Sequence, residues 1–142
     1  MPKKRILGID PGTKTLGIAI SNSDLTVASP IFTIQRKKLK SDLNELLEVL
    51  KKYDVTGIII GWPLNMDGSI GPRCDSVRDF VKSLLEVIDI PILLQDERMS
   101  TMAIEKPMIK ADLTRKKRNS KTDQLAACWI LQTALDVLPK RM

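Results

Sequence analysis

Three acidic residues from distant parts of the chain occupy positions typical of metal ligands: Asp10, Glu97 and Asp123. Asp10 ends a short apolar run and precedes a Pro-Gly turn, Glu97 follows another apolar run, and Asp123 lies near the start of the last helical pattern. The sequence contains no histidine, and carboxylate oxygens are the ligands that hard divalent cations prefer. This combination predicts a Mg²⁺ or Mn²⁺ site and excludes an imidazole as general base.

Each acidic residue also has a simpler structural interpretation. An aspartate before Pro-Gly often stabilises a turn through its own side chain. Ser120 to Asp123 has the spacing of a helix capping box, and Glu97 beside Arg98 is compatible with an exposed ion pair. The joint pattern favours a functional site, because all three acids stand where a core element begins or ends.

The basic residues are concentrated in two clusters. The chain has 23 basic and 17 acidic residues and a net charge of +6. One cluster covers positions 36–40, and the denser one precedes Asp123 and consists of Arg115, Lys116, Lys117 and Arg118. Basic runs bind phosphate backbones through counterion release, although a solvated loop explains a single run equally well. Two tryptophans, one tyrosine and two phenylalanines are too few for a broad base-stacking platform.

Composition indicates one globular domain over residues 1–142. Of these residues 43% are hydrophobic and 28% charged, and the length is sufficient for a real core. No apolar run has the length of a signal peptide core or a membrane span, so we expect a cytoplasmic protein without a membrane partner. The two cysteines, Cys74 and Cys128, are far apart in sequence and are expected to be reduced thiols, not zinc ligands.

Hydrophobic periodicity predicts five strands and four helices. The expected strands are 6–9, 16–21, 27–34, 55–60 and 92–94. The expected helices are 41–53 with Ser41 as N-cap, 73–88, a short one from 100 to 106, and 121–138 after a basic linker at 110–119. Short turns make the first three strands antiparallel, and helical crossovers make the last two parallel to the first. We therefore predict an α/β fold with a mixed five-stranded sheet in the order 3-2-1-4-5.

This arrangement brings the acids towards one another. Asp10 falls on the central strand, and Glu97 follows the strand two places away. On the last helix, Asp123 shares the spacing of Ala126, Ala127, Ile130 and Ala134, so it belongs to the inward face. A carboxylate on an inward face needs a metal, a hydrogen-bond donor or a proton. The loop 61–72 follows strand 55–60 and lies where α/β proteins bind ligands, although its Trp62 is expected to pack under its own loop.

Five motifs resemble the YqgF family, bacterial proteins described as candidate Holliday junction resolvases or pre-16S rRNA nucleases. They lie in the family's order over nearly the whole chain, at residues 8–14, 61–73, 96–101, 111–118 and 123–127. The resemblance implies a ribonuclease-H-like fold and a metal-dependent nuclease site at Asp10, Glu97 and Asp123. It also implies a cytoplasmic role in maturing the 5′ end of 16S rRNA, with precursor ribosomal particles as partners.

The expected chemistry is hydrolysis of a phosphodiester with two divalent ions about 4 Å apart. In this hypothesis Asp10 bridges both ions, and Glu97 and Asp123 each complete one coordination shell. Lys14 and Arg98 contact phosphate, and the basic run 115–118 holds the nucleic-acid backbone without reading its sequence. The remaining residues assigned to the site belong to its loop: Trp62, Asn65, Asp67 and Arg73.

Three alternatives remain open. A Holliday junction resolvase would cut branched DNA and should act as a two-fold dimer, whereas an rRNA nuclease is compatible with a monomer or a homodimer. A non-catalytic nucleic-acid-binding or transcription-associated factor would use the same basic surface without turnover. An ATP-binding domain of the actin and sugar-kinase type has a similar Asp-Pro-Gly-Thr turn, but usually needs two such domains.

Overall fold

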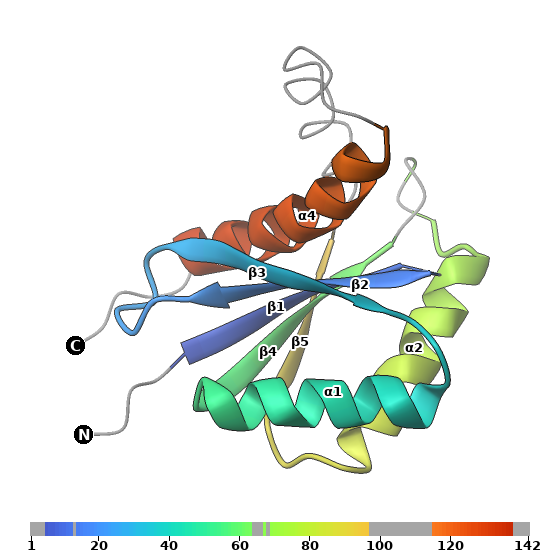
Figure 1. Cartoon of the computed structure of the whole chain (residues 1–142), viewed down its shortest axis with the longest axis horizontal. Helices are drawn as coiled ribbons and strands as arrows, with labels where there is room; N and C mark the ends of the chain where they lie inside the picture. Colours follow the sequence, from blue (N-terminus) through green and yellow to red (C-terminus); the bar gives the residue numbers. More distant parts are fainter. Residues whose placement is uncertain (1–4, 13, 64–66, 68, 97–114, 138–142) are drawn as a thin grey trace.

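The computed structural model shows a mixed five-stranded sheet with helices on both faces (Figure 1). It describes residues 5–12, 14–63, 67, 69–96 and 115–137; for residues 115–123 it describes the helix but not the side chains. The strands are β1 (Arg5–Pro11), β2 (Thr15–Ser21), β3 (Ala28–Gln35), β4 (Val55–Trp62) and β5 (Ile92–Asp96). The helices are α1 (Leu39–Lys52), α2 (Pro72–Leu85) and α4 (Arg115–Val137).

The strand order is β3-β2-β1-β4-β5, which confirms the prediction. β1 pairs antiparallel with β2 and parallel with β4, and β4 pairs parallel with β5. In this register Ile9 lies beside Ile60, and Trp62 lies beside Asp96. Since β1, β4 and β5 are parallel, their carboxyl ends share one edge of the sheet. That edge is where α/β folds place ligands, and Asp10 lies at it.

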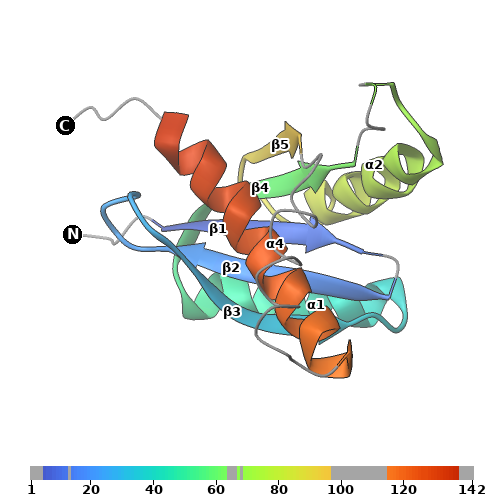
Figure 2. The same ribbon diagram turned by 90° about the horizontal axis from the view of Figure 1, so that it is seen from above.

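One face of the sheet is covered by α1 and α2, and the other by α4 (Figures 1 and 2). On the first face Leu7 and Ile9 are fully buried in a core that also contains Leu46, Val77 and Phe80. Side chains alternate between the two faces of a strand. The apolar residues of β1 at odd positions therefore point to α1 and α2, and its even positions point to α4.

The α4 face depends on small residues. Ala127 and Ile130 are fully buried there, with Ala134 2% exposed, which confirms the predicted inward face of this helix. A Cβ atom at Gly8 of β1 would lie 2.7 Å from Cβ of Leu131 and 3.0 Å from the carbonyl oxygen of Ala127. Only glycine fits at this position, so α4 approaches the central strand unusually closely.

The start of α4 corrects two predictions. The helix begins at Arg115, so residues 115–119 are helical and not part of a linker. Ser120 therefore stands inside a helix, and the capping-box interpretation of Asp123 is wrong. Arginine and lysine are good helix formers, and no glycine or proline occurs between positions 115 and 137. The basic run lacks apolar periodicity, which is why sequence reasoning placed it outside the helix.

The start of α1 corrects a third prediction. The N-cap is Lys38, without a side-chain hydrogen bond, so Ser41 does not cap this helix. Instead, Oδ1 of Asp42 in the first turn accepts a hydrogen bond from the backbone nitrogen of Lys37, at 3.0 Å. The expected short helix at 100–106 lies outside the described residues. Over the described part of the chain, no helix combines the length and the apolar character needed to cross a bilayer.

Both cysteines are free thiols within the fold, as predicted. Cys74 is fully buried on α2, and partial burial raises the pKa of the Cys128 thiol on α4. Because the thiolate is the reactive form, we expect the native protein to react with iodoacetamide at pH 8 at least about tenfold more slowly than the urea-unfolded chain. Mass spectrometry of timed samples measures this, and equal rates at Cys128 in the two states would contradict it.

Candidate active site at the carboxyl edge of the sheet

Asp10 lies on the α4 face of the central strand, one position before β1 ends. The two residues before it on the same face are Ile6, which packs in the α4-side core, and Gly8, which touches α4. Asp10 pairs with Gly17 of β2, so the residue directly across the strand pair has no side chain. The carboxylate is half-buried, and the β2 residue paired with Asp10 adds no side chain beside it.

The direction of α4 places its earlier turns towards Asp10. Gln132, in the later half of the helix, accepts a hydrogen bond from the backbone nitrogen of Ala28 and donates one to the carbonyl of Thr26, both at 2.9 Å. Ala28 pairs with Ser21, whose hydroxyl accepts a hydrogen bond from the backbone nitrogen of Ile6. The later half of α4 thus lies near the start of β1, and the helix runs back across the sheet from there (Figure 2). Position 123 is one helical turn before Ala127, on the side of the carboxyl edge.

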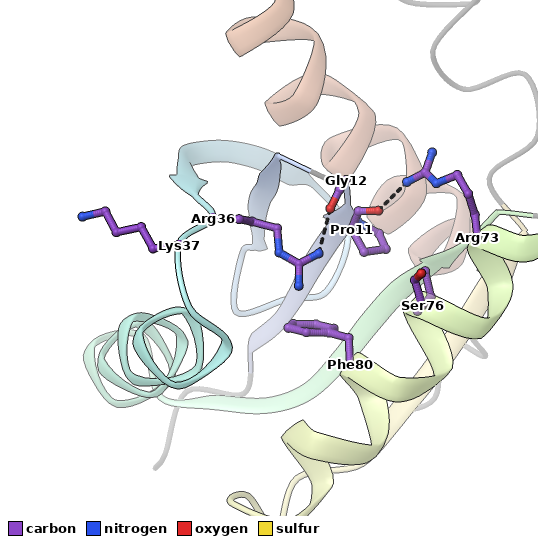
Figure 3. Close-up of a pocket in the computed structure, with 8 residues that line it drawn as sticks. Pro11, Gly12, Arg36, Lys37, Arg73, Ser76 and Phe80 are labelled. Carbon is purple, nitrogen blue, oxygen red and sulfur yellow. Dashed lines mark hydrogen bonds between the residues drawn. The ribbon is translucent and has the colours of Figure 1, made fainter.

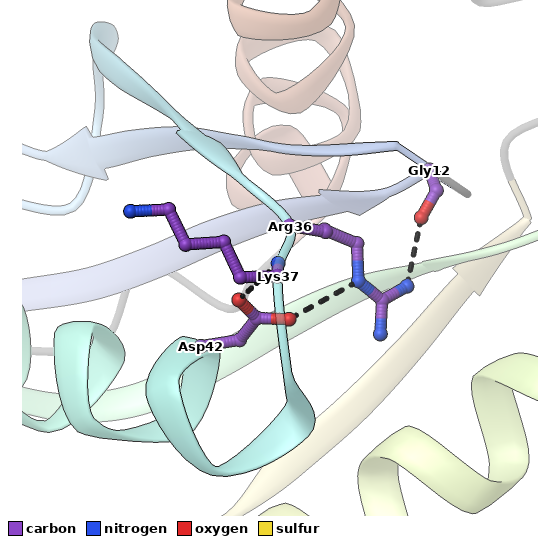
Figure 4. A network of polar contacts seen from close by, with 4 residues as sticks. All are labelled: Gly12, Arg36, Lys37 and Asp42. Atoms are coloured by element: carbon purple, nitrogen blue, oxygen red, sulfur yellow. Dashed lines mark hydrogen bonds and ion pairs between the residues drawn. The ribbon is translucent and has the colours of Figure 1, made fainter.

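The turn after Asp10 is held by two arginines from the opposite face of the sheet. Nη1 of Arg36 donates to the carbonyl of Gly12 at 2.8 Å (Figure 4), and Nη2 of Arg73 donates to the carbonyl of Pro11 at 2.8 Å. The backbone nitrogen of Gly12 also donates to the carbonyl of Thr15, at 2.9 Å. A Cβ at Gly12 would come within 2.7 Å of that carbonyl oxygen, so the tight turn requires glycine. Three contacts therefore fix the two residues that follow the candidate ligand.

Asp42 anchors one of these arginines. Its side chain is 2% exposed, and its Oδ2 lies 3.5 Å from Nε of Arg36 (Figure 4). Sequence reasoning missed this residue. A signal was present, because Asp42 shares the helical stripe of Leu46 and Val49, both buried, and a carboxylate on such a stripe needs a partner.

Comparison with known proteins identifies the family. A family model described as RuvX, Holliday junction resolvase, matches residues 4–137. The chain belongs to the RuvX family. This finding confirms the resemblance to the YqgF proteins and classes the protein with nucleases.

RuvX relatives with high identity carry the name of candidate pre-16S rRNA nucleases. One from Ruegeria sp. (strain TM1040) is 49% identical over 131 residues, covering 92% of this chain and 83% of the relative. One from Methylocella silvestris is 46% identical, covering 96% of this chain and 85% of the relative. One from Rhodospirillum rubrum is 44% identical, covering 99% of this chain and 88% of the relative.

Two solved structures of resolvases share this fold. T. thermophilus RuvC in complex with a Holliday junction substrate superposes with a TM-score of 0.59 at 16% identity, covering 94% of each chain. The fowlpox virus resolvase in complex with Holliday junction DNA gives 0.53 at 13% identity, covering 93% of this chain and 97% of that one. At these identities the likeness establishes the fold alone, and it confirms the predicted ribonuclease-H-like architecture.

The structure describes only some of the predicted site residues in full. Glu97, Arg98 and Asn65 lie outside the described residues, and Asp123 and the basic run 115–118 are placed by their helix only. Within the described part of the chain, no three metal-ligating side chains come together. Asp10 is thus the one proposed metal ligand whose position on the sheet is described through its side chain.

The described loop residues have mainly structural contacts. Trp62 is half-buried against the core, and the Arg78 guanidinium lies 5.8 Å from its ring centroid, which agrees with the expected packing role. Asp67 accepts hydrogen bonds from the backbone nitrogen and hydroxyl of Ser69, as in a turn. Lys14 is exposed just after the Gly12 turn, while Arg73 reaches the turn directly.

Replacing Asp42 should weaken the contacts by which Arg36 holds the turn after Asp10. We expect Asp42→Ala to lower the free energy of unfolding by about 2–3 kcal/mol, because the Arg36 guanidinium and the Lys37 amide lose their acceptor. Urea denaturation measures the change. The matched control is Asp75→Ala, which removes an exposed ion pair with Arg78 and should change stability by less than about 0.5 kcal/mol. Equal losses in the two variants would contradict the assigned role of Asp42.

Proposed function

We propose that this RuvX protein is a divalent-metal-dependent nuclease that hydrolyses phosphodiester bonds at the 5′ end of the 16S rRNA precursor in the cytoplasm. The proposed metal ligands are Asp10, Glu97 and Asp123. The observation that carries the proposal is the placement of Asp10 at the carboxyl edge, on the face covered by the helix that contains Asp123. The names of the RuvX relatives support the choice of substrate.

The donor set fits a hard cation. The three proposed ligands offer carboxylate oxygens only, and the sequence contains no histidine to favour a softer metal. Gly17, the β2 residue paired with Asp10, adds no side chain that would compete for a bound ion. When bound, Mg²⁺ or Mn²⁺ would neutralise the phosphate and supply a water of lowered pKa.

The protein's own residues would orient the reacting groups. The Arg36 and Arg73 hydrogen bonds to Gly12 and Pro11 hold the end of β1 in place, so the Asp10 carboxylate is pre-positioned. Lys14 extends from the same turn and is proposed to contact a phosphate oxygen, with Arg98 as its counterpart after β5. The basic run 115–118 at the start of α4 would hold the strand by its backbone phosphates.

A Holliday junction resolvase is the second candidate. The description of the RuvX family model favours it. Resolution of a junction requires two symmetric cuts, so this function predicts a two-fold dimer with two sites. A nuclease that matures one RNA end needs one cut for each event.

One cleavage panel tests these candidates. Three substrates are compared: 5′-extended 16S precursor RNA, plain single-stranded RNA, and a four-way DNA junction. Each is incubated with Mg²⁺, Mn²⁺ or chelator. Metal-dependent cutting of the precursor supports the proposal, and paired symmetric cuts in the junction would replace it with resolution. Binding of all three substrates without any cutting would favour a non-catalytic nucleic-acid-binding factor.

A further inference from the structure

A pocket lies behind the Asp10 turn, on the face of the sheet covered by α1 and α2 (Figure 3). Its volume is about 360 Å³, within the range of small-ligand sites. Its walls come from the end of β1, the β3–α1 link and the first turns of α2. The lining residues are Pro11, Gly12, Arg36, Lys37, Arg73, Ser76, Val77 and Phe80.

The charge of this pocket is positive. Asp42 balances Arg36, but Arg73 forms no ion pair with any of the described residues. The Lys37 side chain points away from the cavity and contributes its backbone (Figure 3). The positive charge of Arg73 therefore has no balancing carboxylate among the described residues, which favours an anionic ligand.

The two guanidinium groups have donors to spare. A guanidinium carries five N–H donors. Arg36 uses Nη1 on Gly12 and Nε on Asp42, and Arg73 uses Nη2 on Pro11. Within the described chain, Nη2 of Arg36 and Nη1 of Arg73 have no acceptor.

Helix α2 adds an apolar ring, Phe80, and a polar hydroxyl, Ser76, to the lining of the pocket. The Arg36 guanidinium lies 5.5 Å from the Phe80 ring centroid, so the ring fixes its plane. Ser76 stands on the α2 wall with a hydroxyl that can donate to an oxygen anion (Figure 3). Two guanidinium groups, a hydroxyl and one apolar ring suit a phosphate ester with its attached sugar, since guanidinium groups bind phosphate in a bidentate manner.

We propose that the pocket formed by Arg36, Arg73 and Ser76 binds a backbone phosphate of the nucleic-acid strand. It is a second contact site, separated from Asp10 by the thickness of the sheet and joined to it by the Pro11–Gly12 turn. The strand would then pass around the carboxyl edge, from the α4 face to the α1–α2 face. This inference rests on the proposed function for the nature of the strand, but not for the anion chemistry of the pocket.

The test measures binding without cleavage. A fluorescein-labelled 12-nucleotide single-stranded RNA is titrated with the full chain in chelator at 150 mM salt, where distant charges are screened. Ser76→Asp places a negative charge in the pocket and leaves both arginine–carbonyl bonds in place. Lys37→Gln removes one positive charge outside it, so the two variants have the same net charge. Ser76→Asn is the neutral control for the substitution itself.

We expect Ser76→Asp to weaken RNA binding at least about tenfold, and Lys37→Gln and Ser76→Asn less than about twofold. In ¹⁵N spectra of the wild type, the RNA should shift the amide signals of Gly12 and Val77. Equal weakening by Ser76→Asp and Lys37→Gln would overturn the inference in favour of a diffuse basic surface, and so would unshifted Gly12 and Val77 signals. AMP binding as tight as that of the RNA would overturn the strand assignment in favour of a free nucleotide.

This binding test and the cleavage panel can fail independently of each other. Pocket binding in a protein that never cuts with Mg²⁺ or Mn²⁺ would refute the nuclease proposal and leave this site standing. Metal-dependent cutting without any pocket signal would refute the site alone.

Discussion

Asp10→Asn is expected to lower metal-dependent cleavage by about 10³-fold or more. The substitution keeps the shape of the side chain and removes the negative charge with which the proposed ligand would hold a divalent ion. Losing several kcal/mol of charge stabilisation corresponds to a rate loss of this order. The variant should fold normally, because Asp10 stands at a half-buried strand end and not in the apolar core. The measurement is the initial cleavage rate of 5′-extended precursor RNA in Mn²⁺, together with the melting temperature.

The matched control is Asp24→Asn, which removes the same charge from an exposed turn between β2 and β3. It should cleave at the wild-type rate. RNA binding in chelator should be retained by Asp10→Asn, since the basic residues are untouched. Full metal-dependent cleavage by Asp10→Asn would remove this residue from the site and with it the ligand set proposed here.

Gly8→Ala is expected to produce the largest loss of stability from a single methyl group. The new Cβ would lie 2.7 Å from Cβ of Leu131, an atom that can move only with the α4 backbone. Overpacking of this kind costs about 1–3 kcal/mol, and we expect about 2 kcal/mol here, or about 6–8 °C in the melting temperature. Thermal denaturation followed by circular dichroism measures it. Displacement of α4 should also slow cleavage about tenfold or more at a temperature where the variant is folded.

Gly57→Ala provides the comparison within the same sheet. A Cβ at Gly57 of β4 would meet only Cγ1 of Ile6, at 3.7 Å, which is ordinary contact distance. Its stability should change by less than about 0.5 kcal/mol. If Gly8→Ala were equally harmless, the close approach of α4 to β1 would not be needed for folding or for the site.

Much of the fold could be predicted because its signals are local. The β4 strand, Val55–Trp62, is a continuous apolar and β-branched run typical of a strand buried on both faces. Connection lengths then determined which neighbours are antiparallel and which are parallel. The start of α4 was missed for the opposite reason: its first turns are polar, and helix propensity alone is a weak signal.

The support of the site could not be predicted in the same way. Asp10 was found because an acid at a strand end before Pro-Gly is visible in the sequence. The contacts of Arg36 and Arg73 with Gly12 and Pro11 join elements that are 24 and 62 positions apart, and no periodicity encodes such pairs. The position of Asp42 on an apolar helical stripe indicates that its carboxylate has a buried partner, but the sequence does not identify that partner.

In the described part of the chain the two faces of the sheet are covered by different numbers of helices, which has a consequence for motion. Two helices, α1 and α2, bury large side chains on one face, whereas α4 packs on the other through Ala126, Ala127 and Ala134 together with Ile130, Leu131 and Leu135. Partial opening events begin where the least apolar area is lost. We therefore expect the amides of α4 to exchange with deuterium faster than those of β1 and β4. In such an opening the sheet stays intact while the helix bearing Asp123 lifts from the strand bearing Asp10, so we expect heating to abolish the proposed cleavage before it unfolds the sheet.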